Sequence, residues 1–448
     1  MTTMKNFEIN KISKILILLI MPVFFSACEI NDLSDPNGPS LSAISQNATI
    51  GEIRNIAIGT ENLMRDQIGF YYDVTSIIGR EYYFFTNSDP RYTGELLGKG
   101  ASTLDNAGFY GTRPYQGRYR VVRNAEILLT TLETTSEVIS AEARNGYAGF
   151  AKTCQAYSLL LALNLQYQNG IRTDVKDPDN LGPFRSYADA LGDVSTLLDD
   201  AFTSLQGAGT EFDFPLSSGF SGFDTPSTFG QLNRAIKARV ELYRGNKGAA
   251  LTALTSSFMN LAGSLNAGPS HFYSDLGTEI ANPVFRTPDQ SEATIAHPSF
   301  LTDILPGDNR AGKVTLRPSG TRTLDGLAGN YDVTIFTSFN SPIPIIRNEE
   351  LILIYAEANI GTDNAEAVNA LDIIRNAHGL GGYAGGLTDN EVTNEMLYNR
   401  RFSLFGEGHR WIDLRRFNLL NTLPIDRTDD DVWDQFPRPV NEVGVQGG

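Results

Sequence analysis

Several short segments carry residue types that could bind a phosphate, a nucleotide or a metal ion, but none has the required spacing. Gly94–Gly100 is one residue short of a phosphate-binding loop and lacks the Ser or Thr after the lysine. Gly379–Ala384 imitates a dinucleotide fingerprint, yet it follows an expected helix instead of a strand. Asp177, Asp179 and Gly182 match part of a calcium loop whose bidentate glutamate is missing, which leaves bound calcium unsupported. We therefore expect no cofactor and no metal site.

The residues needed for hydrolysis are equally scattered. Gly219–Gly222 lacks the Gly-x-Ser-x-Gly spacing of a nucleophile elbow, and the chain has no His-Glu-x-x-His zinc helix. No two histidines fall at metal-ligand spacing; they are His271, His297, His378 and His409. With 52 acidic residues, pairs of carboxylates arise by chance and carry no weight. These patterns predict a protein without catalytic activity.

Residues 66–115 hold the densest group of aromatic rings interleaved with Asp, Asn and Arg. Ring faces can stack on the apolar face of a small ligand, while the polar side chains hydrogen-bond its edge. The residues that we expect to contact a ligand are Tyr72, Asp73, Tyr83, Arg91, Tyr92, Tyr110 and Arg113. Which rings face outward stays open, because Tyr82–Phe85 could equally be a buried strand.

Helices must position this segment, and their signals are strong. Apolar residues recur at steps of three and four along most of the remaining chain. The expected helices span residues 121–132, 140–168, 187–205, 229–244, 249–261, 349–360, 364–374 and 392–405. Asp363 with Glu366, and Thr388 with Glu391, predict capping boxes at two helix starts. The short turn Asn246–Gly248 predicts an antiparallel helix hairpin.

The hairpins resemble tetratricopeptide repeats in a degenerate form, since no regular period of about 34 residues is present. We predict a mainly α protein with a helical scaffold over about 116–262 and 347–420. Long irregular loop regions, about 66–115 and 263–346, interrupt the scaffold, and such loops are usually functional. A single domain over 46–448 is expected.

The N-terminus predicts export and lipid attachment. Three lysines precede the apolar run Ile15–Phe25, which is too short to span a bilayer but suits a signal peptide. The run ends in Phe25–Cys28 (Phe-Ser-Ala-Cys), which resembles a lipobox with Phe in place of the usual Leu. We expect 1–27 to be a lipoprotein signal peptide, Cys28 to carry acyl chains, and the acidic, turn-rich 28–45 to be a tether. An ordinary signal peptide with an incidental cysteine is the alternative.

The negative charge of the chain argues against a function in nucleic-acid binding. The formal net charge is −16, and the first 27 residues contribute +2, so the remainder carries −18. Binding to phosphate backbones needs a concentrated basic patch. The two cysteines, Cys28 and Cys154, do not predict a disulfide if Cys28 is lipidated. Cys154 lies in an apolar helical run, where a lone thiol acts as a small hydrophobic side chain.

Three C-terminal segments resemble one family. They are Ile345–Ala358 (Ile-Ile-Arg-Asn-Glu-Glu-Leu-Ile-Leu-Ile-Tyr-Ala-Glu-Ala), Ala370–Arg375, and Arg400–Arg416, which contains Phe-Gly-Glu-Gly-His-Arg-Trp-Ile-Asp-Leu-Arg-Arg. Together they resemble the RagB/SusD family of nutrient-uptake outer-membrane lipoproteins. The usual motif begins Glu-Arg, where this chain has Asn399-Arg400. Upstream helical segments that also match are Tyr119–Leu132, Gly149–Leu165 and Phe229–Leu254.

The resemblance implies a SusD-like fold and a non-catalytic protein at the cell surface, anchored in the outer membrane by its lipid. Such a protein captures a nutrient, most often an oligosaccharide, and delivers it to a TonB-dependent SusC-like outer-membrane transporter. The loops would then supply the ligand site. Glu407, Arg410 and Asp413 fall at steps of three, so we expect them to pair along one helix as architecture rather than catalysis.

Two other functions stay open on the sequence alone. A lipid-anchored surface glycoside hydrolase would need two opposed carboxylates with separated pKa values, and would cleave candidate glycans. A tetratricopeptide-like adaptor would have no small-molecule ligand and would fail a binding screen.

Overall fold

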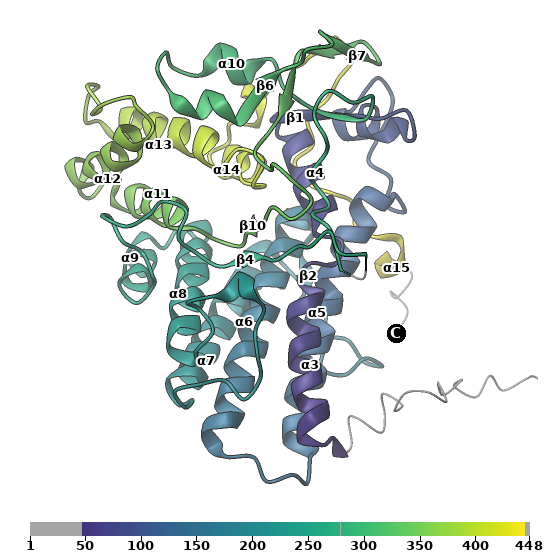
Figure 1. Ribbon diagram of the computed structural model, residues 1–448, viewed down its shortest axis with the longest axis vertical. Helices are drawn as coiled ribbons and strands as arrows, with labels where there is room; N and C mark the ends of the chain where they lie inside the picture. The colour runs from purple at the N-terminus through teal and green to yellow at the C-terminus, as the bar shows by residue number, and fades with distance from the viewer. Residues whose placement is uncertain (1–46, 278, 444–448) are drawn as a thin grey trace, which may run out of the picture.

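The computed structural model describes residues 47–277 and 279–443 (Figure 1). The predicted signal peptide, the predicted lipidation residue Cys28 and the tether over 28–45 lie outside these described residues. The α-helices are α3 (Ile50–Leu63), α4 (Ile68–Ile78), α5 (Phe109–Thr134), α6 (Ala141–Gln166), α7 (Tyr187–Gln206), α8 (Pro226–Tyr243), α9 (Lys247–Thr255), α10 (Ser299–Asp303), α11 (Asn348–Asn359), α12 (Asn364–Ala377), α13 (Asp389–Ser403), α14 (Arg410–Arg416) and α15 (Val440–Val443).

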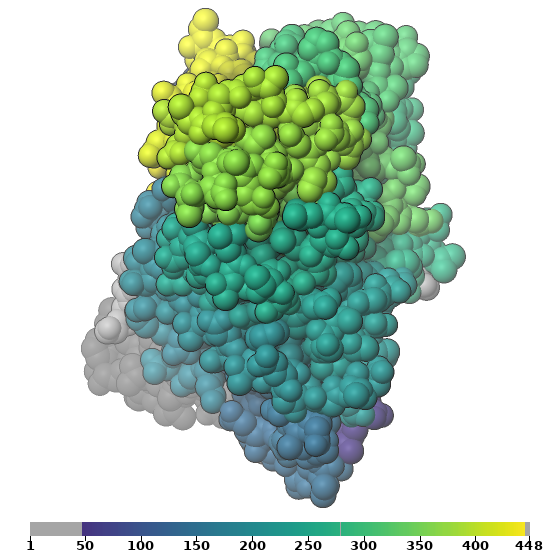
Figure 2. All heavy atoms as spheres, turned by 90° about the vertical axis from the view of Figure 1, so that its left-hand side faces the viewer, coloured from purple at the N-terminus to yellow at the C-terminus, as the bar shows by residue number. Residues whose placement is uncertain are grey.

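Consecutive helices pack side by side into one curved array, which runs from α3 and α5 through α9 to α11, α12 and α13 (Figure 1). Seen from the outside of the array, α9 and its neighbours form a teal band below the yellow-green band of α12 and α13 (Figure 2). Helices α6 and α7 approach closely at Gly149. A Cβ there would lie 2.5 Å from Leu205 Cγ and 3.0 Å from the Ala201 carbonyl oxygen. The glycine therefore sets the spacing of this hairpin.

Two apolar clusters fill the scaffold. The larger cluster contains residues from each of the helices α3 to α8, from the strands, and Trp411 of α14. The smaller cluster lies among α11, α12 and α13 around Leu353, Leu371 and Met396. Among the described residues, no helix combines the length and the apolar character needed to cross a bilayer. The apolar surfaces of the long helices are instead buried against one another.

Short strands and loops cover one end of the array (Figure 1). The strands are β1 (Tyr82–Phe85), β2 (Ile171–Arg172), β3 (Phe184–Arg185), β4 (Ser270–His271), β5 (Ala293–Ala296), β6 (Val314–Leu316), β7 (Arg322–Leu324), β8 (Leu327–Gly329), β9 (Tyr331–Val333) and β10 (Ile343–Pro344). Four of them form an antiparallel sheet in the order β1-β5-β9-β6, in which Tyr83 lies opposite Ile295. The edge strand β1 and its neighbour β5 are buried along their whole length, so this half of the sheet is covered on both faces.

The mainly α fold with helix hairpins and long loop regions is confirmed, and most helix bounds agree with the periodicity. Helix α8 begins at Pro226, earlier than predicted, because Thr225 caps it and a proline suits the first turn. Helix α9 ends at Thr255 and not at Leu261. The chain leaves the helix there, and Asn260 N then donates to Asn348 Oδ1 of α11 at 2.8 Å.

The capping predictions have different outcomes. Thr388 and Glu391 form the full reciprocal capping box at the start of α13. The Asp363 side chain accepts a hydrogen bond from Glu366 N at 3.0 Å. The Glu366 side chain, however, accepts one from the Tyr355 hydroxyl at 2.9 Å and none from the backbone N–H of Asp363. The box at α12 is therefore only half formed.

Residues 66–115 contain more helix than the pattern predicts. Helix α4 lies inside this segment, and α5 begins at Phe109. Every residue of α4 except Phe70 is buried, so the helix has no polar face and its sequence shows no one-sided stripe. The description of this region as mostly irregular was wrong for α4.

Candidate ligand-binding site

A cavity of about 340 Å³ lies where the two loop regions meet. The first region supplies residues 65–70, Asp73 and Tyr92, and the second supplies Ile280, Pro283 and Arg286. The volume is in the range of small-molecule sites. We refer to this cavity as the aromatic pocket.

Two aromatic rings line the aromatic pocket, those of Phe70 and Tyr92, and the Phe109 ring packs against both. The Phe70 ring of α4 and the Tyr92 ring each lie 5.5 Å from the Phe109 ring at the start of α5, with edge-to-face geometry. Phe70 and Phe109 are only partly buried. Such a cluster offers apolar ring surface to a ligand at low conformational cost, because aromatic side chains have few rotatable bonds.

Two arginines lie over these rings. The Arg91 guanidinium is 4.6 Å from the centre of the Phe109 ring, and the Arg113 guanidinium is 5.2 Å from Phe70 and 5.5 Å from Phe109. Asp89 accepts two hydrogen bonds from the Arg91 guanidinium, at 2.6 and 2.9 Å, and this contact lowers the pKa of Asp89. Arg113 has an exposed side chain and makes no hydrogen bond or ion pair among the described residues. Its donors are therefore available to a ligand.

An ion pair between Asp73 and Arg286 lies in the wall of the pocket. Arg286 donates to the two carboxylate oxygens of Asp73 at 2.6 and 3.1 Å, and Tyr82 donates to the same carboxylate at 3.1 Å. Burial alone would lower the pKa of Arg286, but the Asp73 carboxylate more than offsets this effect and the pKa is raised. The guanidinium also lies 3.9 Å from the centre of the Phe84 ring. The pair links α4 to the second loop region.

Four of the seven residues predicted to contact a ligand lie in or beside the aromatic pocket. Asp73 and Tyr92 line it, and Arg91 and Arg113 lie over its rings. The Tyr92 hydroxyl has no hydrogen-bond partner within the described residues. Contact between these four residues and a ligand stays a prediction.

The other three predicted residues are core residues, and this corrects the expectation that their rings face a ligand. Tyr72, Tyr83 and Tyr110 are 4%, 2% and 0% exposed. Tyr83 lies in β1, whose two faces are covered, and its ring stacks on Phe85 at 5.3 Å. The Tyr110 hydroxyl donates to Glu95 and accepts from Asp105 N. Rings of this kind stabilise the fold and offer no free face.

Phe70 and Arg286 are among the pocket residues that the sequence reasoning missed. Phe70 is the one α4 residue that is not buried, and a helix prediction over 68–78 would have drawn attention to it. Arg286 lies in a loop without periodicity, and nothing near it in the sequence indicates its partner Asp73, which is 213 residues away. Only the fold brings the two together.

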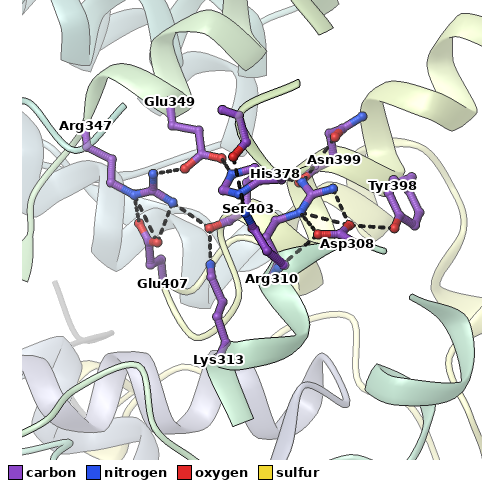
Figure 3. Close-up of polar contacts among 12 residues, drawn as sticks. Asp308, Arg310, Lys313, Arg347, Glu349, His378, Tyr398, Asn399, Ser403 and Glu407 are labelled. Atoms are coloured by element: carbon purple, nitrogen blue, oxygen red, sulfur yellow. Dashed lines mark hydrogen bonds and ion pairs between the residues drawn. The ribbon is translucent and has the colours of Figure 1, made fainter. Parts of the chain in front are cut away.

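The predicted pairing of Glu407, Arg410 and Asp413 along one helix is wrong, although the motif is architectural. Helix α14 begins at Arg410, so Glu407 lies outside it. Glu407 pairs with Arg347 at 2.8 Å (Figure 3), and Arg410 donates to the Gly79 carbonyl at 2.9 Å.

Asp413 completes this network. It pairs with Arg400 at 2.7 Å and with Arg416 at 2.8 Å, and all three side chains are largely buried. The charges of the motif therefore connect α14 and the residues just before it to the end of α4, the start of α11 and α13. Within the described residues, no group of three or more His, Cys, Asp or Glu side chains could hold a metal ion.

Comparisons with known proteins agree with this architecture. Residues 333–444 match the model of the SusD family. At the level of sequence, no curated protein matches the chain.

Solved structures resemble nearly the whole chain. A SusD superfamily protein from Bacteroides thetaiotaomicron has a TM-score of 0.66 at 19% identity, and covers 89% of this chain and 98% of its own. NanU from Bacteroides fragilis has a TM-score of 0.65 at 14% identity, with 92% and 97% covered. Surface glycan-binding protein A from Bacteroides uniformis has a TM-score of 0.64 at 14% identity, with 88% and 98% covered. At these identities the likeness establishes the fold.

Proposed function

We propose that this chain is a member of the SusD family, since residues 333–444 match the model of that family and the fold resembles that of a SusD superfamily protein. As such a member it would be a non-catalytic surface lipoprotein that binds a glycan. In this proposal the protein captures an oligosaccharide and delivers it to a TonB-dependent SusC-like transporter in the outer membrane. One structural relative is itself described as a surface glycan-binding protein.

The aromatic pocket is the observation that carries the proposal. A sugar presents an apolar face of C–H groups and a rim of hydroxyls, and the pocket presents ring surface beside arginine donors. Each stacking contact contributes about 0.5–1.5 kcal/mol beyond burial. A few such contacts give an affinity in the micromolar to millimolar range, about −8 to −4 kcal/mol. Weak binding of this kind suits a protein that must release its ligand to a partner.

The same pocket argues against the two alternatives. A glycoside hydrolase needs two opposed carboxyl groups that act on the substrate, and the two carboxylates that line the pocket, Asp66 and Asp73, are each held in an ion pair with an arginine. A cavity of about 340 Å³ beside Arg113, which has no ion pair among the described residues, is more typical of a ligand-binding protein than of an adaptor without a ligand. Incubation of the protein with its best-binding glycans should therefore leave them uncleaved.

Calorimetry with a glycan found by array screening tests the site. Phe70→Ala removes a partly buried ring from the pocket and should weaken binding about tenfold, the equivalent of one or two stacking contacts. The matched control is Phe184→Ala, since Phe184 is also partly buried and has Arg438 4.1 Å from its ring, but lies in β3 away from the pocket. Equal affinity of the wild type and Phe70→Ala would place the site elsewhere.

The anchor and the partner belong to the same proposal. We infer that the mature chain begins at Cys28, with 28–45 as the tether and 46–448 as a single domain. Metabolic labelling with an alkyne fatty acid should modify the wild type and leave Cys28→Ser unlabelled. Purification from native membranes should recover the β-barrel transporter with the wild-type protein. A Cys28→Ser protein that is still labelled would remove the anchor from the proposal.

A further inference from the structure

A second and larger cavity lies on another part of the molecule. Its volume is about 620 Å³, and it shares no residue with the aromatic pocket. Its walls come from residues 309–313, from the segment that joins β9 to β10, from the start of α11 and from residues 405–407. We refer to it as the charged cleft. Figure 3 labels its charged residues, which are Arg310, Lys313, Arg347, Glu349 and Glu407.

The carboxylates of the charged cleft are already neutralised. Arg347 donates to both Glu349 and Glu407, with the Glu407 contact at 2.8 Å (Figure 3). Glu349 also contacts His378 at 2.7 Å. Arg310, the other arginine of the wall, pairs with Asp308 at 2.6 Å. Each of these arginines therefore has its carboxylate partner in the protein.

Lys313 is the exception. Its Nζ donates one hydrogen bond, to the Ser403 carbonyl oxygen at 2.5 Å, and no described carboxylate lies within 4.0 Å of it. An ammonium group has three N–H donors, so two remain available. Burial and the nearby charge of Arg347 lower the pKa of Lys313 to about 8, although Glu407 and Glu349 act in the opposite direction. An unpaired ammonium in the wall of a cavity favours an anion beside it.

Apolar residues line the cavity beside this charge. Ile335, Phe336 and Pro344 face the charged cleft together with Lys313. An anion of inorganic size would leave most of about 620 Å³ unfilled and would not contact these residues. A sugar that carries an acidic group could use both the ammonium and the apolar wall.

We propose that the charged cleft binds the anionic group, a carboxylate or a sulfate ester, of an acidic saccharide, with Lys313 as its main contact. This inference rests on the proposed glycan-binding function and names the chemical class of one ligand. The anion accepts the two free N–H donors of Lys313 while the ring of the sugar lies against Phe336. The aromatic pocket then contacts other units of the chain or a separate neutral glycan.

Two pairs of probes test the inference by calorimetry. The first pair is an oligomer of galacturonic acid and its methyl ester, and the second is a sulfated galactan oligomer and its desulfated form. Wild-type protein should prefer at least one acidic probe over its neutral counterpart by about tenfold, since hydrogen bonds to charged groups are strong. The acidic probe that is preferred identifies carboxylate or sulfate as the ligand group. No preference for either acidic probe overturns the inference.

Variants of Lys313 connect the preference to this residue. Lys313→Met keeps the apolar stem and should abolish the preference, whereas Lys313→Arg should keep it. The matched control is Lys247→Met, because Lys247 also donates to a single backbone carbonyl, that of Ile360 at 2.6 Å, but lies outside the charged cleft. A preference that survives in Lys313→Met overturns the inference.

Chemical labelling gives a readout that does not depend on the variants. An amine-reactive ester at pH 8 should modify Lys313 in the wild-type protein, and the preferred acidic probe should protect it, as measured by peptide mass spectrometry. Labelling of Lys247 should be unchanged by the probe. A Lys313 that is modified equally with and without the preferred probe contradicts the inference.

The failure of this inference can be distinguished from a failure of the proposed function. If neutral glycans bind in a manner that depends on Phe70 but acidic probes show no preference, the charged cleft is excluded and the glycan-binding function stands. If no glycan of either kind binds, both are wrong.

Discussion

Arg239 of α8 and Glu350 of α11 form a two-pronged ion pair in which Nε to Oε1 and Nη2 to Oε2 are each 2.6 Å. Both side chains are buried, at 4% and 1% exposure. Arg239 Nη2 also donates to the Ile345 carbonyl at 3.1 Å, so this nitrogen contacts both the carboxylate and the backbone. Burial alone would raise the pKa of Glu350, but Arg239 reverses this effect and the pKa is lowered. The pair joins the upstream helix array to the C-terminal helices.

Removal of one partner of this pair should be costly. We expect Arg239→Met to lower the free energy of unfolding by about 3–5 kcal/mol, because it leaves the buried carboxylate of Glu350 without a counter-charge. The double variant Arg239→Met/Glu350→Leu should recover much of the loss. Urea denaturation measures both, and Arg54→Ala, which breaks the exposed pair with Asp213, should change little. A single variant as stable as the wild type contradicts the prediction.

This pair also shows where the sequence stops being informative. Periodicity and caps locate elements because both depend on neighbours within a few residues, as at Ser186, which caps α7 by accepting from Asp189 N at 3.2 Å. Arg239 and Glu350 are 111 residues apart, and no local pattern links them. Glu407 illustrates the same limit. Its spacing of three residues from Arg410 suggested a pair between these two side chains, but in the fold Glu407 pairs with Arg347.

The prediction of ligand-contacting rings in residues 66–115 was partly wrong for a different reason. A ring in a covered strand such as Tyr83 and a ring beside a cavity such as Tyr92 belong to the same residue type and lie nine residues apart. What separates them is the surroundings of each ring, since the rings of Phe85 and His297 pack against Tyr83 at 5.3 and 5.2 Å. The sequence therefore located the region of the candidate site and could not choose among its rings.

Acid should destabilise the protein partly through His409. Burial lowers the pKa of His409 to about 4, against about 6.5 in an unfolded chain, and its Nδ1 has no hydrogen-bond partner among the described residues. His409 therefore becomes protonated below about pH 6.5 in the unfolded state, but only below about pH 4 in the folded state. Stability should fall over this interval by on the order of 2 kcal/mol from this group.

His409→Gln removes this titration. The melting temperature of the variant should fall less steeply than that of the wild type between pH 6.5 and 4. Scanning calorimetry across this interval measures the slopes, and parallel curves for the two proteins would show that His409 does not contribute.

Glu81 should have the opposite pH dependence. Its carboxyl is buried beside Gly406: Oε1 accepts from Gly406 N at 3.1 Å, and Oε2 has no partner among the described residues. Burial raises the pKa of Glu81 to about 7. A raised pKa in the folded state means that the contribution to stability is full below about pH 4.5 and is lost as the pH rises through about 7.

Glu81→Gln should therefore be more stable than the wild type at pH 8.5, by on the order of 1–3 kcal/mol, and similar to it at pH 4.5. Urea denaturation at the two pH values measures the difference. A variant that is less stable than the wild type at both pH values would mean that Glu81 is ionised without penalty in the fold.

Tyr92 and Tyr110 give a matched test of which rings lie at the ligand and which lie in the core. Both rings pack 5.5–5.6 Å from Phe109. The Tyr92 hydroxyl at the aromatic pocket has no partner in the part of the chain that the structure describes, whereas the Tyr110 hydroxyl has two partners inside the protein. Tyr92→Phe should leave the melting temperature unchanged and weaken glycan binding by about 0.5–1.5 kcal/mol, the net value of one hydrogen bond. Tyr110→Phe should lower stability by about 1–3 kcal/mol, since Glu95 and Asp105 N lose their partner, and should leave binding unchanged. Calorimetry and thermal unfolding of the two variants separate these effects. If Tyr92→Phe changes stability and not affinity, its ring belongs to the core and the ligand lies elsewhere.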